Sequence, residues 1–401
     1  MSRKIFTDSN LRIVYSVTLM AVMGVGVIAP ALPRMARELM LSPQAVGLLI
    51  TAFTVPGVIL APLLGVLADR HGRRRILVPS LFLFAVAGAA CALARDFTVL
   101  LSLRFLQGMG AAALGSLNVT LIGDLFDGRE RAAAMGYNAS VLSLGTATYP
   151  ALGGALAEWS WRYPFLVALL AVPVGLLVMF RLHNPEPKQA QSLREYLGGV
   201  WRTVWRREVA GLFSVSVMTF VLLYGSILTY FPILLDRNFG ASPSLIGLLI
   251  SVQSVATAVV SSRLGRLSRR FSQRDLILAA FGLYALSLAT MPLLPDWRLL
   301  FGPALLFGAA MGLNIPSLQT LLAGLAPAER RAAFMSINGM VLRLGQTLGP
   351  VVMGAMYAGG GLRATFYGGA VLAMATILLV VGMVPRAGME SRAPGNSTGS
   401  T

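Results

Sequence analysis

Long apolar stretches, separated by short polar ones, follow one another along the whole chain. Each stretch can cross the hydrocarbon core of a bilayer as a helix, which takes roughly 20 residues. A membrane β-barrel would instead show short segments of alternating polarity. We therefore predict twelve transmembrane helices, at 12–33, 46–68, 76–95, 97–123, 132–157, 162–182, 209–235, 244–264, 275–294, 298–324, 331–357 and 362–384.

A repeat with a spacing of 200 residues divides these helices into two sets. The string SPQAVGLLI at 42–50 returns as SPSLIGLLI at 242–250. The longer string RAAAMGYNASVLSLGTATYPALGG at 131–154 returns as RAAFMSINGMVLRLGQTLGPVVMG at 331–354. Such internal symmetry is typical of duplicated membrane proteins. The expected fold is an all-α membrane protein whose twelve helices form two pseudo-symmetric six-helix bundles.

Two polar segments interrupt or end this pattern. One is rich in Pro and Arg and separates the repeats, and the other is a Gly- and Ser-rich tail of a kind that tends to be disordered. The expected organisation is a bundle at 1–182, a cytoplasmic linker at 183–208, a second bundle at 209–384 and a disordered cytoplasmic tail at 385–401.

Composition agrees with a membrane location and excludes a soluble domain. The chain is 56% hydrophobic and 12% charged, and its mean hydropathy is +0.73, which is more apolar surface than a soluble interior could bury. The net charge of +17 could suggest nucleic acid, but the basic residues gather in alternate loops. The positive-inside rule predicts that those loops and both termini are cytoplasmic. We expect the protein in the bacterial inner membrane, with its basic surface next to anionic lipids.

The sequence offers no residues for enzyme chemistry. Cys91 is the single cysteine, so neither an intrachain disulfide nor a thiolate metal site is possible. We find no nucleophile–base pair, phosphate loop or cluster of metal ligands, and the first apolar run lacks a signal-peptide cleavage site. We therefore expect no enzyme activity, no cofactor and no metal.

The loop after the second predicted helix reads GVLADRHGRRR, from Gly65 to Arg75. Gly65 permits close helix approach, Asp69 ends a helix and Gly72 turns the chain, while the arginines stay with water and lipid phosphate. This string resembles the signature loop of the major facilitator superfamily. The chain as a whole also resembles that family, along essentially its full length. The resemblance implies a conformational latch, in which Asp69 contacts the start of the eleventh helix in the outward-open state. The latch residues would be Gly65, Asp69, Arg70, Gly72, Arg73 and Arg74.

The fourth predicted helix carries a charge inside the membrane. Arg104, Gln107, Gly108 and Asn118 fall on one face of this helix. A charge so placed should face a water-filled cavity or a partner, unless it snorkels to the headgroups. The pattern R-x-x-Q-G resembles the family's fourth-helix signature, which implies a part in proton movement.

The fifth predicted helix is rich in glycine. Gly136, Gly145, Pro150, Gly153 and Gly154 let it bend and approach neighbours closely, and packing alone could also explain them. Their spacing resembles the antiporter motif of the drug:proton antiporter branch of the family, which implies a hinge. Tyr149 stands where the motif has glycine, and this departure weakens the antiporter assignment.

A second intramembrane arginine, Arg343, lies near the middle of the eleventh predicted helix. It adds a permanent positive charge to a polar face that it shares with Ser336, Gln346 and Thr347. Backbone carbonyls could alternatively satisfy it. Further candidates for the substrate cavity were selected by helical spacing and polarity. They are Asn338 on the same helix, Asn118, Asn138, Tyr149, Thr219, Ser226, Tyr230 and Asn314.

The carboxylates are absent from the predicted spans. All sixteen lie in loops, tails or helix ends, whereas many proton-driven exporters of the family place one in the first or fourth helix. Glu158 and Asp236, near the outer face, are the remaining candidates for a proton carrier, although a role as solvated loop charges is the favoured interpretation for both. With a positive cavity and no embedded acid, neutral or anionic substrates are expected rather than cationic ones.

The expected function is secondary transport, with proton-coupled efflux of a small amphipathic compound as the first hypothesis. Transport would proceed by alternating access, driven by an ion gradient, with the protein functional as a monomer and without nucleic-acid partners. A second hypothesis is uptake or flipping of an organic anion or anionic lipid. A third is a membrane sensor or scaffold that has lost transport.

Overall fold

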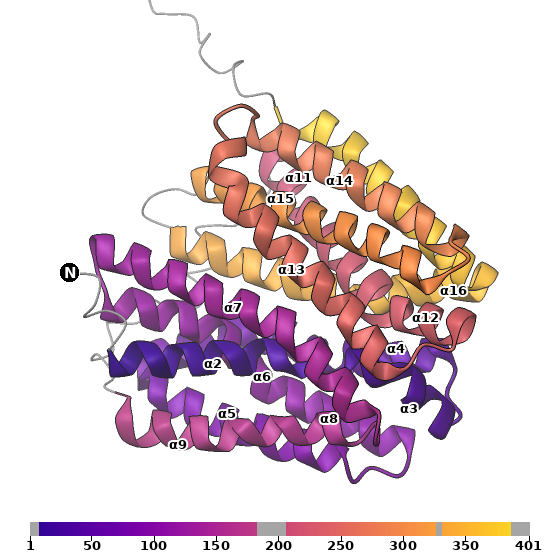
Figure 1. Ribbon diagram of the computed structural model, residues 1–401. Coiled ribbons are helices and arrows are strands. Elements are labelled where there is room, and N and C mark those ends of the chain that lie inside the picture. The colour runs from indigo at the N-terminus through magenta and orange to yellow at the C-terminus, as the bar shows by residue number, and fades with distance from the viewer. Residues whose placement is uncertain (1–7, 183–205, 326–330, 386–401) are drawn as a thin grey trace, which may run out of the picture.

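The computed structural model describes residues 8–182, 206–325 and 331–385, and these residues form helices and the loops that join them. The two repeats form two bundles that lie against each other (Figure 1). The first bundle contains α2 (Ser9–Gly26), η1 (Ala29–Ala31), α3 (Leu32–Glu38), α4 (Pro43–His71), α5 (Arg73–Cys91), α6 (Phe97–Leu125), α7 (Gly128–Ala157), α8 (Tyr163–Leu166), η2 (Val167–Leu170) and α9 (Ala171–Arg181). The second contains α11 (Arg207–Val221), η3 (Leu222–Tyr230), α12 (Phe231–Phe239), α13 (Pro243–Leu267), α14 (Gln273–Thr290), η4 (Met291–Leu293), η5 (Trp297–Leu300), α15 (Phe301–Leu325) and α16 (Arg331–Met383).

The predicted all-α architecture is confirmed. Ten helical stretches of the described residues are long and apolar enough to cross a membrane. One of them, Ile337–Met383, is interrupted by non-helical backbone at Gly360 and Gly361 and therefore consists of two rods. The more polar α7, with 30 residues, is a further rod. The described chain thus contains the twelve rods that the apolar pattern predicts.

The repeated Ser-Pro pair explains why two of these helices begin where they do. Ser42 accepts a hydrogen bond from the backbone N–H of Ala45, and Pro43 occupies the first turn of α4. Ser242 caps α13 in the same way, with Pro243 in the first turn. A serine N-cap followed by proline suits a helix start, because proline lacks the N–H that would stay unpaired there.

Each bundle has its own apolar core. One core is built from residues between Leu11 and Leu182, and the other almost entirely from residues between Val209 and Val384. The predicted linker falls mostly on 183–205 and the predicted tail mostly on 386–401, both outside the described residues, and α11 already begins at Arg207.

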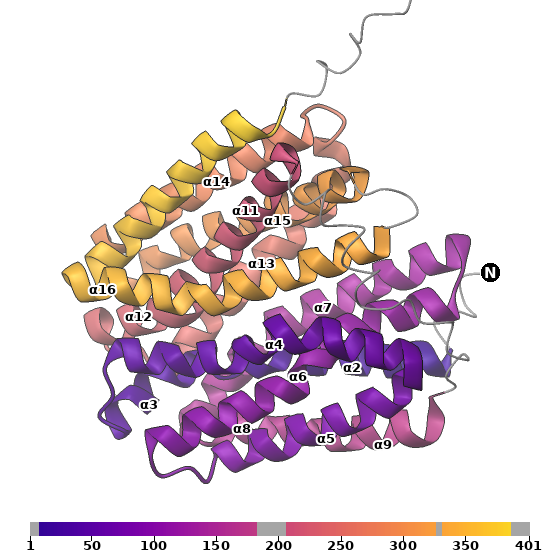
Figure 2. The same ribbon diagram turned by 180° about the vertical axis from the view of Figure 1, so that it is seen from behind.

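The helices run between two ends of the molecule. The terminal end holds Asp8 and the turns at Gly72 and Asp127, and the distal end holds the turns at Met40 and Gly240. Helix α13 lies beside α7, and α16 lies beside α4, so these four helices join the bundles (Figures 1 and 2). The bundles meet towards the distal end and spread apart towards the terminal end (Figure 1).

One irregularity was not predicted from the sequence. The segment η3 is a π-helix of nine residues in the middle of the rod that α11, η3 and α12 form. The Thr229 hydroxyl donates to the carbonyl of Tyr224, five residues earlier, at 2.7 Å. Gly225 there lies against the backbone of Gly349 in α16. Helices of the π type are rare in proteins as a whole, and those that occur are often found at functional sites. The rod formed by α11, η3 and α12 is therefore a candidate to contribute to the functional site.

Candidate functional site

Glycine–proline contacts close the distal end of the bundle interface. Gly47 of α4 lies against Pro350 of α16, where an added Cβ would be 3.3 Å from the proline Cβ. The second contact, related to the first by the 200-residue repeat, joins Gly247 of α13 to the carbonyl of Pro150 in α7. Small residues at these positions let the helix backbones approach closely.

Towards the terminal end, glycines on the same four helices meet no neighbour among the residues that the structure describes. A Cβ added to Gly65 or Gly265, a pair related by the repeat, would have no heavy atom within 4 Å. The same holds for Gly136 in α7 and Gly339 in α16. The bundle interface is therefore tight at its distal half and loose at its terminal half.

Three threonines join the bundles near the middle of this interface. Thr51 of α4 donates to the carbonyl of Thr347 in α16 at 3.2 Å. The Thr347 hydroxyl donates to the hydroxyl of Thr54 at 3.0 Å. Thr347 was expected on the polar face of Arg343, whereas Thr51 and Thr54 were not selected from the sequence.

Arg343 lies one helical turn from Thr347, at the point where the bundles begin to part. Its guanidinium reaches across the interface to the first bundle, where it packs over Gly57 of α4 and lies near Gly115 of α6. It donates one hydrogen bond, at 3.3 Å, to the carbonyl of Ala112. A backbone carbonyl thus satisfies part of the group, as the alternative interpretation expected.

The charge of Arg343 has no carboxylate partner in the described part of the chain. The titratable group that interacts with it electrostatically is Tyr224, at the beginning of the π-helical segment η3. A half-buried cation of this kind, next to an aromatic phenol and hydroxyl groups, is suited to bind an anionic or hydrogen-bond-accepting ligand.

Several predicted cavity residues bind one another inside the first bundle. Asn118 of α6 donates to the hydroxyl of Thr18 in α2 at 2.8 Å. Thr18 in turn donates to the Asn138 side chain of α7 at 2.5 Å. All three side chains are buried. They link three helices, and a contact with substrate stays a prediction.

The second bundle has a related arrangement. Asn338, 200 residues after Asn138, accepts a hydrogen bond from Ser216 of α11 at 3.3 Å. Asn314 of α15 donates to the hydroxyl of Thr219 at 2.7 Å. These four side chains are also buried, so each bundle is held by asparagine–hydroxyl pairs between its helices.

The remaining cavity candidates lie apart from one another. Tyr149 is buried near Gly145 of its own helix and Gly26 of α2. Ser226 is buried beside Gly369. Tyr230 stacks on Tyr357 with ring centroids 5.5 Å apart. Gln346 is half-buried on α16, and the Ser336 side chain lies outside the described part of the structure.

Arg104 of α6 is enclosed within the first bundle. It is 0% exposed, so a snorkelling position is excluded. Its Nη1 donates to Oε1 of Gln107 at 2.6 Å, and its Nε donates to the carbonyl of Leu49 at 3.3 Å. The Phe53 ring lies 4.3 Å from the guanidinium carbon, and Gly108 lets α6 touch the backbone of Phe53. Arg104 therefore has protein partners, and its role in proton coupling stays a prediction.

A polar network caps the distal end. The Glu158 carboxylate accepts from the N–H of Ser244, at the start of α13, at 3.0 Å. Arg34 of α3 donates to the carbonyls of Ala157 and Glu158 at 2.7 and 2.6 Å. Arg37 forms an ion pair with Asp236 of α12. Two of these interactions, at Glu158 and Asp236, join the two bundles.

The environment of Glu158 favours its charged form. Burial raises the pKa of this carboxyl. Hydrogen bonds from the Ser244 N–H and from the Ser242 and Ser244 side chains lower the pKa, as does the nearby charge of Arg34, and together they outweigh the effect of burial. Its pKa therefore lies below the usual value. Both acids proposed as proton carriers, Glu158 and Asp236, thus bind the opposite bundle across the distal contact.

Comparison with known proteins places the chain in a family. The sequence model described as Major Facilitator Superfamily matches residues 14–237 and 222–399. The chain belongs to the major facilitator superfamily. It is 26% identical over 363 residues to the bacillibactin exporter of Bacillus subtilis, covering 86% of this chain and 89% of that protein. It is 27% identical over 388 residues to the class C tetracycline resistance protein of Escherichia coli, covering 94% and 96% of the two chains.

Solved structures of transporters share the fold. The crystal structure of the nucleoside transporter NupG matches with a TM-score of 0.78 and 14% identity, covering 94% of this chain and 99% of that one. The D-xylose-proton symporter matches with a TM-score of 0.73 and 18% identity, covering 94% and 98%. The protein is an integral membrane protein with the transporter fold of this superfamily.

The loop that resembles a superfamily signature, from Gly65 to Arg75, is held by ion pairs within the first bundle. In the described part of the chain, Asp69 pairs with Arg73 at 2.5 Å, and Arg73 also pairs with Asp124 of α6 at 3.0 Å. Gly72, with a φ of 93°, makes the turn between α4 and α5. The predicted latch to the start of α16 involves the outward-open state and stays a prediction. Arg70 and Arg74 flank this turn.

The glycines whose spacing resembles an antiporter motif have distinct contacts. Gly145 faces Leu19 and Val22 of α2, and Gly153 faces the backbone of Val27, so both serve packing within the first bundle. Gly154 instead meets the backbone of Pro243 in α13. The C-terminal part of α7 is thus a contact surface between bundles, and its role as a hinge stays a prediction.

Sequence reasoning missed Gly57, Tyr224 and the two α4 threonines. It also missed the contact glycines Gly47 and Gly247, which the repeat could have pointed out, because these two glycines occupy equivalent positions, as do Pro150 and Pro350. No sequence signal relates Gly57 to Arg343, which lie 286 positions apart in the sequence.

Proposed function

We propose that this protein exports a small amphipathic compound, neutral or anionic, from the cytoplasm across the bacterial inner membrane in exchange for protons. Arg343 carries the proposal, since it places a cation where the bundles part, and the described residues supply no carboxylate to pair with it. The exporter names of the relatives support the direction, and the superfamily supports the proton gradient as the driving force.

The basic loops orient the protein in the membrane. Arg70, Arg73, Arg74 and Arg75 lie at the terminal end, and such loops stay on the cytoplasmic side. On this assignment the terminal end, where the bundles spread, faces the cytoplasm. The conformation is then inward-facing, ready to receive a cytoplasmic substrate at Arg343. Rocking of the bundles about this site would open the distal end.

Transport by reconstituted protein tests this function. We expect proton-driven export of a fluorescent aromatic monocarboxylate, with weaker transport of an ethidium-like cation. Removing a hydrogen-bonded charge costs about 1.5–3 kcal/mol, so Arg343→Gln should weaken anion transport by roughly tenfold or more, with Arg343→Lys retaining part of it. The control Arg298→Gln removes an exposed arginine of the second bundle. Robust cation export that is undiminished in Arg343→Gln would exclude the charge argument.

A second candidate is uptake or flipping of an organic anion or anionic lipid. Arg343 is compatible with this function as well, because its charge would attract an anion whichever way the anion is transported. An imposed pH gradient separates the two functions. Antiport is supported if the protein exports the substrate against its own gradient and this export stops when the pH gradient is removed. Uncoupled or inward flux of the anion supports the second candidate.

A further inference from the structure

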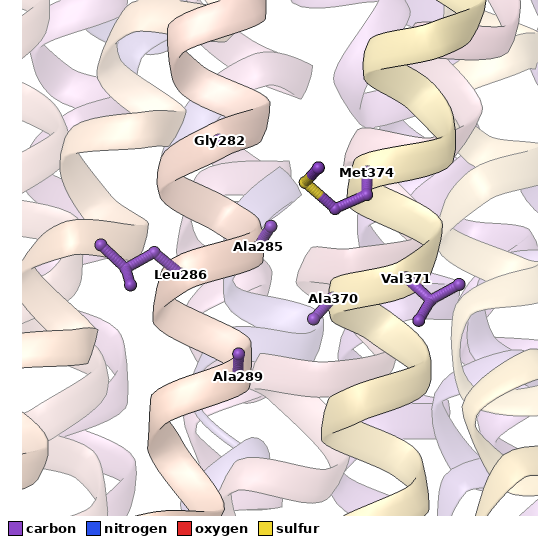
Figure 3. Close-up of a pocket in the computed structure, with 7 residues that line it drawn as sticks. All are labelled: Gly282, Ala285, Leu286, Ala289, Ala370, Val371 and Met374. Atoms are coloured by element: carbon purple, nitrogen blue, oxygen red, sulfur yellow. The ribbon is translucent and has the colours of Figure 1, made fainter.

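A groove opens on the outer surface of the second bundle, between α14 and the C-terminal part of α16. Its volume is about 470 Å³. Gly282, Ala285 and Ala289 line it from α14, and Ala370, Val371 and Met374 line it from α16 (Figure 3). Val371 is 66% and Met374 53% exposed. In a membrane protein these apolar side chains face the bilayer.

The two repeats differ in bulk at Gly282, one of the positions that line this groove. In the first bundle the Phe82 ring lies against α9, with ring atoms 3.4–3.5 Å from the position of a Cβ on Gly175. The residue 200 positions later is Gly282. A Cβ added there would have nothing within 4 Å. Where the first repeat carries an aromatic ring, the second thus offers a depression.

A positive charge stands at the distal end of the same helix face. Arg363, Tyr367, Ala370 and Met374 follow the i, i+4, i+7, i+11 spacing of one face of α16. Arg363 is exposed and follows the break at Gly360 and Gly361, where the chain turns at the distal end. In the part of the chain that the structure describes, it forms no ion pair.

The length of this face matches one leaflet. Eleven residues separate Arg363 from Met374, which is about 16 Å of helix at 1.5 Å per residue. Half of a hydrocarbon core of about 30 Å is close to this length. A charge at headgroup level followed by an apolar groove of leaflet depth is complementary to a phospholipid, with a phosphate at one end and an acyl chain at the other.

We propose that this groove is a binding site for a phospholipid of the leaflet on the distal side. One acyl chain lies along Gly282, Ala285 and Ala289, and the phosphate binds the guanidinium of Arg363. The ligand is thus a structural lipid held by the second bundle, at a site separate from Arg343 and independent of the transported compound.

Native mass spectrometry of the full-length protein tests the proposal. The protein is released from vesicles of phosphatidylglycerol and phosphatidylethanolamine into mild detergent, and the retained phospholipids are counted. We expect Gly282→Phe, which restores the ring of the first repeat, to lose one bound phospholipid. Arg363→Gln should weaken retention about tenfold, as expected for a lost hydrogen bond between a guanidinium and a phosphate. A comparison of the two lipids reports whether the net charge of the headgroup adds to the phosphate contact.

Two matched controls separate this site from general lipid contact. Val86→Phe adds a ring to an exposed position of the first bundle, and Arg162→Gln removes an arginine from the distal end of that bundle. Neither should change retention. Because Arg363 is exposed, its variant tests the site even if Gly282→Phe folds poorly. Equal retention by wild type and both site variants would overturn the proposal, and so would a wild-type dimer that Gly282→Phe converts to a monomer, since a second copy would then fill the groove.

Discussion

Gly247 of α13 lies directly against the carbonyl of Pro150 in α7, so that the backbones of the two bundles touch at the distal end. Its counterpart 200 residues earlier, Gly47, lies against Pro350. Pro150 of α7 and Pro350 of α16 therefore do more than affect their own helices. They are the surfaces on which the opposite bundle closes.

Gly247→Val should force the distal contact open. A Cβ at this position would overlap the Pro150 carbonyl, and a main-chain atom cannot yield as a flexible side chain can. We expect the population to shift towards a distal-open state, measured as an increased distance between spin labels on α7 and α13 at this end. Gly265→Val, in open space on the same helix, is the control and should leave the distance unchanged. Equal distances in both variants would show that this contact does not hold the closed state.

Gly57→Ala should displace Arg343 without removing its charge. An added Cβ would overlap the guanidinium, so the side chain must move to a new position. Anion affinity should then fall by about three- to tenfold, the equivalent of roughly 1 kcal/mol. At Gly115 the Cβ would lie 3.2 Å from the guanidinium, so Gly115→Ala should have a smaller effect. Binding isotherms of the wild type and both variants, with an anionic ligand, measure this order, and an inverted order would contradict the position of Arg343.

The distal contact should weaken in acid through Glu158. Because its hydrogen bonds to Ser244 and Ser242 hold the pKa below its ordinary value, the carboxylate is charged and stabilises the closed contact at neutral pH. This stabilisation is lost as the pH falls through that lowered pKa. Distal spin-label distances should lengthen only in strongly acidic solution.

Glu158→Gln supplies the comparison for this pH dependence. It should open the contact at neutral pH and remove the part of the acid response that comes from Glu158. Since Glu158 is exposed, the effect at neutral pH should be modest, at about 1 kcal/mol or less. A wild-type acid response that persists unchanged in the variant would assign it to other groups, among them the Arg37–Asp236 ion pair.

Asn138→Ala and Asn338→Ala should lower thermal stability to a similar degree. Each removes a buried acceptor that joins two helices of one bundle, a loss of about 1 kcal/mol in membrane proteins. The Tm of each purified variant measures this. The ligand affinity of the same variants is measured alongside the Tm. If affinity falls while the Tm is unchanged, the side chain contacts substrate as the sequence predicts.

The sequence by itself determined the class of the fold, its duplication and the position of most rods. Bilayer thickness makes a spanning helix visible as a long apolar run, and a helix forms its hydrogen bonds within its own segment. Motifs such as the loop around Asp69 could be recognised for the same reason, since their residues are contiguous. The π-helix at 222–230 escaped prediction because nothing in its apolar composition distinguishes it from an α-helix.

Only the tertiary structure decided which polar residues meet. Helical spacing put Asn118, Asn138 and Arg343 on polar faces, yet the asparagines bind Thr18 inside one bundle whereas Arg343 reaches across to Gly57. Periodicity gives the face of a helix but not the neighbour that covers it, because that depends on how helices far apart in sequence pack and on where glycine lets their backbones approach. The sequence therefore specified the rods and their repeat, and the packing of the two bundles placed the charge of Arg343 between them.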